Sequence, residues 1–146
     1  MSITSFSGDY RFLSNFWPCS VVLDGILYPS VENAYQAAKT TDNILRRYFE
    51  TCTAGKAKRA GRELDVRSDW NEIKLSTMTD LVTQKFTKDI SLSQMLRDTR
   101  PNELIEGNTW GDVYWGVCNG VGSNHLGKIL MTIRDRICMD ENFTLI

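Results

Sequence analysis

The sequence predicts a mainly α-helical α+β domain with a few short β-strands. Three observations favour this fold class: six segments have helical composition or spacing, one segment carries a hairpin signal, and glycines concentrate in one later stretch. The chain has 146 residues, of which 42% are hydrophobic and 24% charged. This size and mixture suit one compact core, so we expect a single domain over residues 1–146.

The first regular structure predicted along the chain is a short β-hairpin within residues 12–28. Val21, Val22 and Leu23 precede the pair Asp24-Gly25, which is typical of a tight turn between two antiparallel strands. A helix should follow from about Val31 to Lys39, because this stretch is rich in alanine and free of glycine and proline. Ser30 is placed to cap it.

Further helices are predicted from apolar spacing and from their flanking residues. Leu126, Ile129, Leu130 and Ile133 keep the spacing of a buried helix face near the carboxyl end. Pro101 ends the predicted helix 91–99. The predicted segments are 43–49, 54–64, 71–87, 91–99 and 123–138.

A glycine-rich loop is expected between residues 107 and 127. Six of the ten glycines fall there, together with Trp110 and Trp115, two of the four tryptophans. Glycine lets the backbone approach a ligand closely, so this loop is a candidate binding element.

The charge balance argues against a protein held on nucleic acid or membrane by a global field. Lys and Arg number 17 and Asp and Glu 18, which gives a formal net charge of −1. Binding to nucleic acid must therefore be local. Residues 1–6 lack the basic and apolar regions of a signal peptide, and no apolar run approaches the roughly 20 residues of a membrane span.

The cysteines predict neither a disulfide framework nor a zinc site. The four cysteines lie far apart, form no C-x-x-C pair and accompany a single histidine, His125. We therefore expect a cytoplasmic protein that uses no metal and no cofactor.

Glu32, Tyr35, Gln36 and Lys39 share one face of the first predicted helix, since a helix turns by about 100° per residue. One interpretation is a solvated stripe with a Glu-to-Lys side-chain pair. The other is a face presented to a cleft, because the opposite side carries only alanines and Asn33. A carboxylate beside an amine suits general acid–base or Schiff-base chemistry if burial lowers the pKa of the amine.

Asp112 lies inside the glycine-rich loop and has two interpretations. After Gly111 it can simply form a turn. It can also supply a second carboxylate, as glycosidic bond cleavage typically uses one carboxyl group to protonate the leaving group and another to stabilise or activate the attacking centre.

Two further features concern phosphate. The segment Gly122–Lys128 matches the first seven positions of a phosphate-binding P-loop, but Ile129 stands where a hydroxyl must hold magnesium, which argues against a nucleotide-dependent phosphotransferase. In the locally basic stretch 56–67, Arg62 is the strongest candidate for a phosphate contact. Trp70, which follows this stretch, is assigned to the core on composition.

Six segments together resemble the NADAR family of YbiA-like N-glycosidases. They occur in family order and span about residues 6 to 138. Each piece alone is weakly specific, whereas six in register are hard to obtain by chance. The segments are Phe12–Phe16, Pro29–Lys39, Ala60–Arg62, Arg67–Trp70, Asp112–Gly116 and Gly122–Met131.

The resemblance implies an enzyme that hydrolyses N-glycosidic bonds of ribosylated amines. Its substrate would be ADP-ribose on guanine in nucleic acid, or a small metabolite such as a phosphoribosylamino pyrimidine of riboflavin biosynthesis. Glu32, Lys39 and Asp112 match the family's catalytic residues, with Lys39 implicated in a Schiff base. The predicted substrate-binding residues are Asn15, Phe16, Tyr35, Gln36, Arg62, Trp70, Trp115, Gly116 and Asn124.

Two alternatives stay open on the sequence. A module that binds ADP-ribose without cleaving it is the main rival, although Glu32, Lys39 and Asp112 have no common reason to be present in such a module. Thr40 stands where relatives often carry an aromatic residue, which leaves the substrate open. A charged Glu32 also opposes the neutral Lys39 that Schiff-base chemistry needs.

Overall fold

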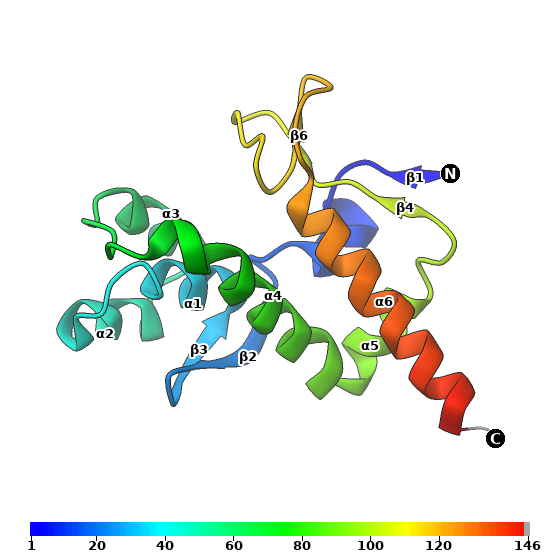
Figure 1. Cartoon of the computed structure of the whole chain (residues 1–146), viewed down its shortest axis with the longest axis horizontal. Helices are drawn as coiled ribbons and strands as arrows, with labels where there is room; N and C mark the ends of the chain where they lie inside the picture. Colours follow the sequence, from blue (N-terminus) through cyan, green and yellow to red (C-terminus); the bar gives the residue numbers. More distant parts are fainter. Residues whose placement is uncertain (145–146) are drawn as a thin grey trace. The chain divides into compact units, whose positions relative to one another are not determined.

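The structure, a computed structural model, describes residues 1–144, with side chains through Asp140, and confirms a mainly helical fold with short strands (Figure 1). The chain divides into two compact units, Asn15–Lys85 and a second formed by Met1–Ser14 with the chain from Phe86 onward. None of the helices within residues 1–144 has the length and apolar character needed to cross a membrane.

The unit Asn15–Lys85 opens with the predicted hairpin of β2 (Pro18–Leu23) and β3 (Ile26–Ser30). The strands are antiparallel, and Leu23 pairs with Ile26 across the turn. Asp24 and Gly25 have φ values of 50° and 80°. Both turn residues thus adopt the left-handed conformation that matches the twist of a two-residue hairpin, which explains the Asp-Gly pair.

Helix α1 (Val31–Ala37) is the central element of this unit. Ser30 caps it, with its Oγ accepting a hydrogen bond of 3.0 Å from Asn33 N. The helix contacts β2, β3, α2 (Asn43–Thr51) and α3 (Ala54–Arg62) (Figure 1). It ends two residues earlier than predicted, because Lys39 N and Thr40 N donate to the carbonyls three residues before them in a tighter turn.

Two small residues allow α3 to approach α1 closely. Ala57 and Gly61 are buried on α3 one helical turn apart. Helix α4 (Trp70–Lys88) follows, with Met78, Leu81 and Val82 in the core. The sequence located each of these helices to within two residues.

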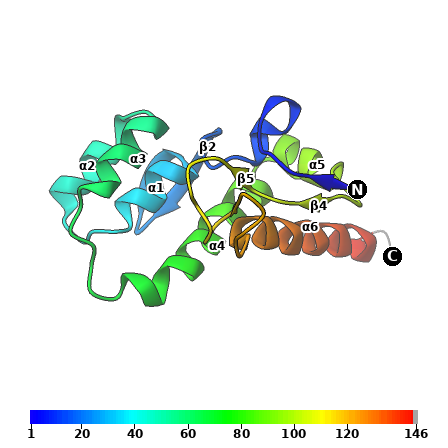
Figure 2. The same ribbon diagram turned by 90° about the horizontal axis from the view of Figure 1, so that it is seen from above.

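The second unit is built on α5 (Ile90–Arg97) and α6 (His125–Thr144), which pack against each other. Strand β4 (Glu103–Leu104) runs beside α6 and pairs in parallel with β1 (Ser2–Ile3) (Figure 2). A 3-10 helix, η1 (Gly8–Leu13), precedes the first unit. The glycine-rich loop contains a short parallel pair, β5 (Gly107–Asn108) with β6 (Val117–Cys118).

Candidate active site

The predicted polar face of α1 is buried, so the interpretation as a solvated stripe is wrong. Glu32 and Gln36 are 7% and 5% exposed. Gln36 Nε2 donates a hydrogen bond of 2.9 Å to Glu32 Oε1. A carboxyl group withdrawn from water is costly unless polar groups surround it, and Gln36 supplies one such group from the next turn.

The start of α1 is held by Asn15, another predicted site residue. Glu32 N donates to Asn15 O over 3.1 Å, which satisfies one of the amide groups that the first turn of a helix leaves unpaired. The Asn15 side chain lies near Met78, with 3.5 Å between Nδ2 and Sδ. Asn15 therefore fixes the backbone that carries Glu32.

Gln36 lies against Gly61 of α3. A Cβ on residue 61 would overlap Gln36 Oε1, so glycine leaves room for this side chain in the orientation that bonds Glu32. Among the described residues, none donates a hydrogen bond to the buried Gln36 Oε1. The amide is thus bonded to Glu32 at one end and packed against a helix backbone at the other.

Lys39 is half-buried just beyond the end of α1. Burial lowers the pKa of its ammonium group below the ordinary value, and the positive charges of Arg62 and Lys74 lower it further, while Glu32 opposes them. Burial therefore outweighs the opposing charge of Glu32, and the net direction of the pKa of Lys39 is downward. Lys39 Nζ lies 5.7 Å from the centroid of the Tyr35 ring.

Tyr35 and Trp70 form an aromatic pair beside this lysine. Their ring centroids are 5.1 Å apart at an interplanar angle of 55°. Trp70 is 6% exposed, which agrees with its assignment to the core. The Tyr35 ring, backed by Trp70, is therefore an aromatic neighbour of Lys39.

Phe16 and Arg62 are exposed residues of the same unit. Phe16 is 43% exposed, and Lys58 Nζ is 5.9 Å from its ring centroid. Arg62, the last residue of α3, is exposed and close enough to Lys39 to influence its pKa. An exposed cation near the lysine suits the predicted phosphate contact.

Arg46 is a positioning residue that the sequence analysis missed. Arg46 is only 4% exposed, and its charged group is satisfied by the protein. Its Nε donates to Thr40 O at 2.8 Å and to Ala37 O at 3.2 Å. The guanidinium also bridges to Asp24 Oδ2 at 2.7 Å. It therefore ties the turn that carries Lys39 to the hairpin. The sequence holds one indication that Arg46 is buried. It lies three residues before the buried Phe49 on α2, so the two residues share one face of the helix.

Asp112 lies in the second unit, within the glycine-rich loop, and forms a turn there. Its Oδ1 accepts hydrogen bonds from Tyr114 N at 3.1 Å and Trp115 N at 2.9 Å. Asn108 exchanges two further hydrogen bonds with the Asp112 backbone. The turn interpretation is confirmed, and a catalytic role stays a prediction.

The other predicted residues of this unit are tied into the same loop. The Trp115 ring meets the Tyr114 ring edge-on, with 4.7 Å between centroids. A Cβ on Gly116 would overlap the Glu106 backbone. Asn124 accepts from Glu106 N at 2.9 Å and donates to Leu104 O at 3.0 Å, so its amide holds the loop to the start of α6. Contact of these residues with substrate stays a prediction.

The comparison with protein families defines the class. Residues 4–138 match the NADAR domain. This match covers both compact units, and the chain belongs to the NADAR family.

Individual relatives and one solved structure agree with this assignment. N-glycosidase YbiA of Escherichia coli is 34% identical over 143 residues, which cover 94% of this chain and 88% of that protein. N-glycosidase Npun_R5314 of Nostoc punctiforme is 32% identical over 88% of this chain and 86% of its own. The NMR structure of E. coli YbiA superimposes with a TM-score of 0.83 at 30% identity, over 97% of this chain and 86% of that one.

A longer relative has a name that refers to a pathway. A riboflavin biosynthesis protein of Vibrio vulnificus is 34% identical over 142 residues and 94% of this chain. The chain spans 38% of the length of that relative.

Proposed function

We propose that this protein is an N-glycosidase that hydrolyses the bond between a ribose and an amino group of a base. One observation carries the proposal: Glu32 is buried on α1, and Lys39 lies half-buried just beyond the end of the same helix. Burial lowers the pKa of the Lys39 ammonium group, although the charge of Glu32 opposes this shift. A carboxyl group that can deliver a proton and an amine that can attack carbon are the two groups such a cleavage needs.

Lys39 acts as the nucleophile in this proposal. The ribosylated amine opens its sugar ring to an imine at the anomeric carbon, and the neutral Lys39 amine adds there. Glu32 protonates the departing nitrogen, which leaves as a free amino group while the anomeric carbon and Lys39 Nζ form a protonated imine. Water adds to that carbon and gives a proton to the Glu32 carboxylate, the carbinolamine collapses with its hydroxyl proton moving to nitrogen, and Lys39 leaves as the amine while the free sugar is released. The net reaction consumes one water.

The other residues have supporting roles in the proposal. Gln36 holds the Glu32 carboxyl group, Tyr35 and Trp70 keep water from Lys39, and Arg62 binds a phosphate of the substrate. We also propose Asp112 as a second catalytic carboxyl group, on the strength of its motif. The sugar is ADP-ribose attached to guanine, or ribose 5-phosphate attached to an aminopyrimidine of the riboflavin pathway. The name of the Vibrio relative makes the second substrate worth testing.

Product analysis by mass spectrometry tests the proposal. The pure protein is incubated with guanine-ADP-ribosylated DNA and, separately, with a phosphoribosylamino pyrimidine. Free ADP-ribose from the first or ribose 5-phosphate from the second supports an N-glycosidase and identifies its substrate. Borohydride added during turnover should trap the sugar on Lys39.

The matched variants are Glu32→Gln and Lys39→Arg. Glu32→Gln keeps a hydrogen-bonding side chain of the same size but cannot deliver a proton as a carboxylic acid does, so it should lose turnover and keep binding. Tight binding by the unmodified protein without product from either substrate would instead establish the alternative, a module that binds ADP-ribose without cleaving it.

A further inference from the structure

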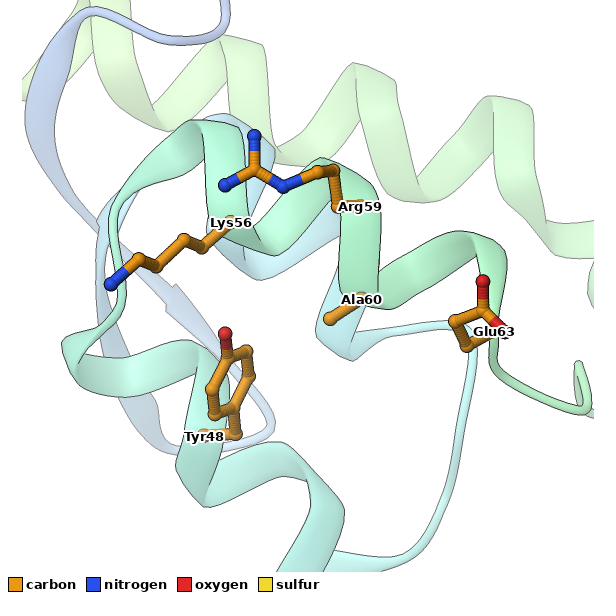
Figure 3. A pocket seen from close by; sticks show the side chains of 5 residues that line it. All are labelled: Tyr48, Lys56, Arg59, Ala60 and Glu63. Atoms are coloured by element: carbon orange, nitrogen blue, oxygen red, sulfur yellow. The ribbon is translucent and has the colours of Figure 1, made fainter.

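A pocket of about 450 Å³ lies between α2 and α3. Its lining consists of one residue of α2, Tyr48, and four from α3 and its end, Lys56, Arg59, Ala60 and Glu63 (Figure 3). The volume is within the range of small-molecule sites. Figure 3 shows Tyr48 facing the row of α3 side chains, with Lys56 and Arg59 toward one end and Glu63 at the other.

This pocket is separate from the Glu32–Lys39 site, although both use α3. At about 100° per residue, Ala57 and Gly61 form the face toward α1, and Lys58 and Arg62 form a second face. Lys58 lies near Phe16, and Arg62 influences Lys39. The pocket residues occupy a third face, roughly 130° around the helix from each of the other two.

The lining combines an aromatic ring with two cations. Tyr48 is 49% exposed, and its ring is held edge-on by the buried Phe49, with centroids 5.5 Å apart. Within the part of the chain that the structure describes, neither Lys56 nor Arg59 is ion paired. A phosphate can therefore bind them without breaking an existing bridge.

These side chains together match a nucleoside phosphate. A base can stack on Tyr48, the phosphate can bind Lys56 and Arg59, and the Glu63 carboxylate can accept from a sugar hydroxyl or a base amino group. Ile44 and Leu45, one turn before Tyr48, are 76% and 46% exposed and extend the apolar surface beside the ring. The pocket residues carry a net positive charge, whereas the whole chain has a net charge of −1. Such a local concentration of positive charge is what nucleic-acid binding by this protein requires.

We propose that this pocket binds a nucleotide of a single-stranded nucleic acid. The proposal rests on the function proposed above, because the same strand would carry the ribosylated base to the Glu32–Lys39 site. A helix with its side chains is about 10–12 Å across, so two faces of α3 are no farther apart than that. At the duplex rise of about 3.4 Å per nucleotide, or at a longer spacing in an extended strand, about three nucleotides are enough to span that separation. The strand is single, because a paired base does not offer its face for stacking.

Binding of an unmodified strand tests the pocket without any chemistry. Fluorescence anisotropy of a labelled ten-nucleotide single-stranded DNA is measured for the wild type, Tyr48→Ala, Arg59→Glu and the control Arg136→Glu, an exposed arginine on α6. Tyr48→Ala and Arg59→Glu should each weaken binding roughly tenfold, and Arg59→Glu should reduce the salt dependence by about one charge. Arg136→Glu should bind as the wild type does.

The other outcomes overturn the proposal. Equal weakening in Arg136→Glu, or no binding by the wild type, removes the pocket as a nucleic-acid site. Competition by a 5′-mononucleotide at the same concentration as the oligonucleotide makes it a site for free nucleotides instead of a strand.

The N-glycosidase proposal and the strand-binding proposal can be contradicted by different results. Arg59→Glu should keep the wild-type rate on a small ribosylated substrate and raise KM only for a modified strand. Glu32→Gln should bind the unmodified strand normally. Loss of catalysis with intact strand binding would count against the N-glycosidase alone.

Discussion

Gln36 donates a hydrogen bond of 2.9 Å from Nε2 to Glu32 Oε1, one helical turn away, and both side chains are buried. The bond fixes the orientation of the carboxyl group before any substrate binds. Gln36 itself is fixed by Gly61, whose missing side chain provides the space for its amide. The orientation of Glu32 therefore depends on a glycine in another helix.

Gly61→Ala should reduce turnover more than stability. The new methyl group would overlap Gln36 Oε1 and Cδ, and the flexible Gln36 side chain would rotate away from Glu32. We expect kcat to fall about 10- to 100-fold and the free energy of unfolding to fall by about 1–2 kcal/mol. Steady-state kinetics and urea unfolding measure the two effects.

Gly55→Ala is the matched control on the same helix. A Cβ at Gly55 meets no atom within 4 Å. The substitution should leave kcat unchanged and stabilise α3 by roughly 0.5–1 kcal/mol, because alanine loses less backbone freedom on folding. If both variants lost activity equally, the Gly61–Gln36–Glu32 arrangement would be irrelevant to catalysis.

Local signals were sufficient for most of the fold. The Asp24-Gly25 turn, the Ser30 cap and the apolar spacing of α6 each act within a few residues, so the sequence located the hairpin and the helices. The pair of β1 with β4 was missed because it joins Ser2 to Glu103 through only two residues on each strand. No periodicity exists in so short a strand.

The sequence predicted which α1 residues share one face, but not which atoms of other segments they contact. Helical geometry alone placed Glu32 and Gln36 on one face of α1. That the face is buried depends on α3, and that Lys39 has a lowered pKa depends on burial and on Lys74. The role of Arg46 depends on carbonyl groups of another segment. Such relationships arise only when distant segments pack together.

The pH dependence of turnover should report the lowered pKa of Lys39. The neutral amine is the nucleophile, so the rate should rise with pH through that pKa, which lies below the ordinary lysine value. Lys74→Gln removes a positive charge that lowers the pKa, so the rising limb should move to higher pH. Lys88→Gln, an exposed lysine on the same helix, should leave the limb in place. A shift to lower pH in Lys74→Gln would exclude Lys39 as the titrating group.

Arg46→Met should destabilise the protein by about 3 kcal/mol. The cost comes mainly from the Ala37 and Thr40 carbonyls, which lose their donor, because the Asp24 side chain is 64% exposed and water can replace its partner. Because the turn with Lys39 then loosens, turnover should fall as well. Arg47→Met changes the exposed neighbour on α2 and should alter stability by less than about 0.5 kcal/mol. Similar losses in both variants would contradict the positioning role of Arg46.

Lys85 should make stability depend on pH above neutrality. It is 2% exposed, and burial lowers its pKa to about 7, against the opposing influence of Cys19. Between pH 7 and the ordinary lysine pKa of 10.5, the unfolded chain binds a proton that the folded chain does not. The free energy of unfolding should therefore rise with pH by about 1.4 kcal/mol per unit in this window and level off below it.

Lys85→Met removes the titrating group and nearly preserves its volume. Urea unfolding at pH 6, 7, 8 and 9 should show a difference in stability between wild type and variant that changes steadily above pH 7. A constant difference across the series would mean that Lys85 keeps its proton in the folded protein.

Asp112→Asn separates a structural role from a catalytic one. Asparagine keeps the Oδ1 that accepts from Tyr114 N and Trp115 N, so the turn and the thermal midpoint should be preserved. It removes the ionisable carboxyl group, so a catalytic Asp112 predicts a fall in kcat of about 100-fold or more. Asp112→Ala should lose the turn as well, at a cost of about 1 kcal/mol. Full activity in Asp112→Asn together with reduced stability in Asp112→Ala would assign Asp112 to the loop alone, and Glu32 would then remain as the acid of the proposed reaction.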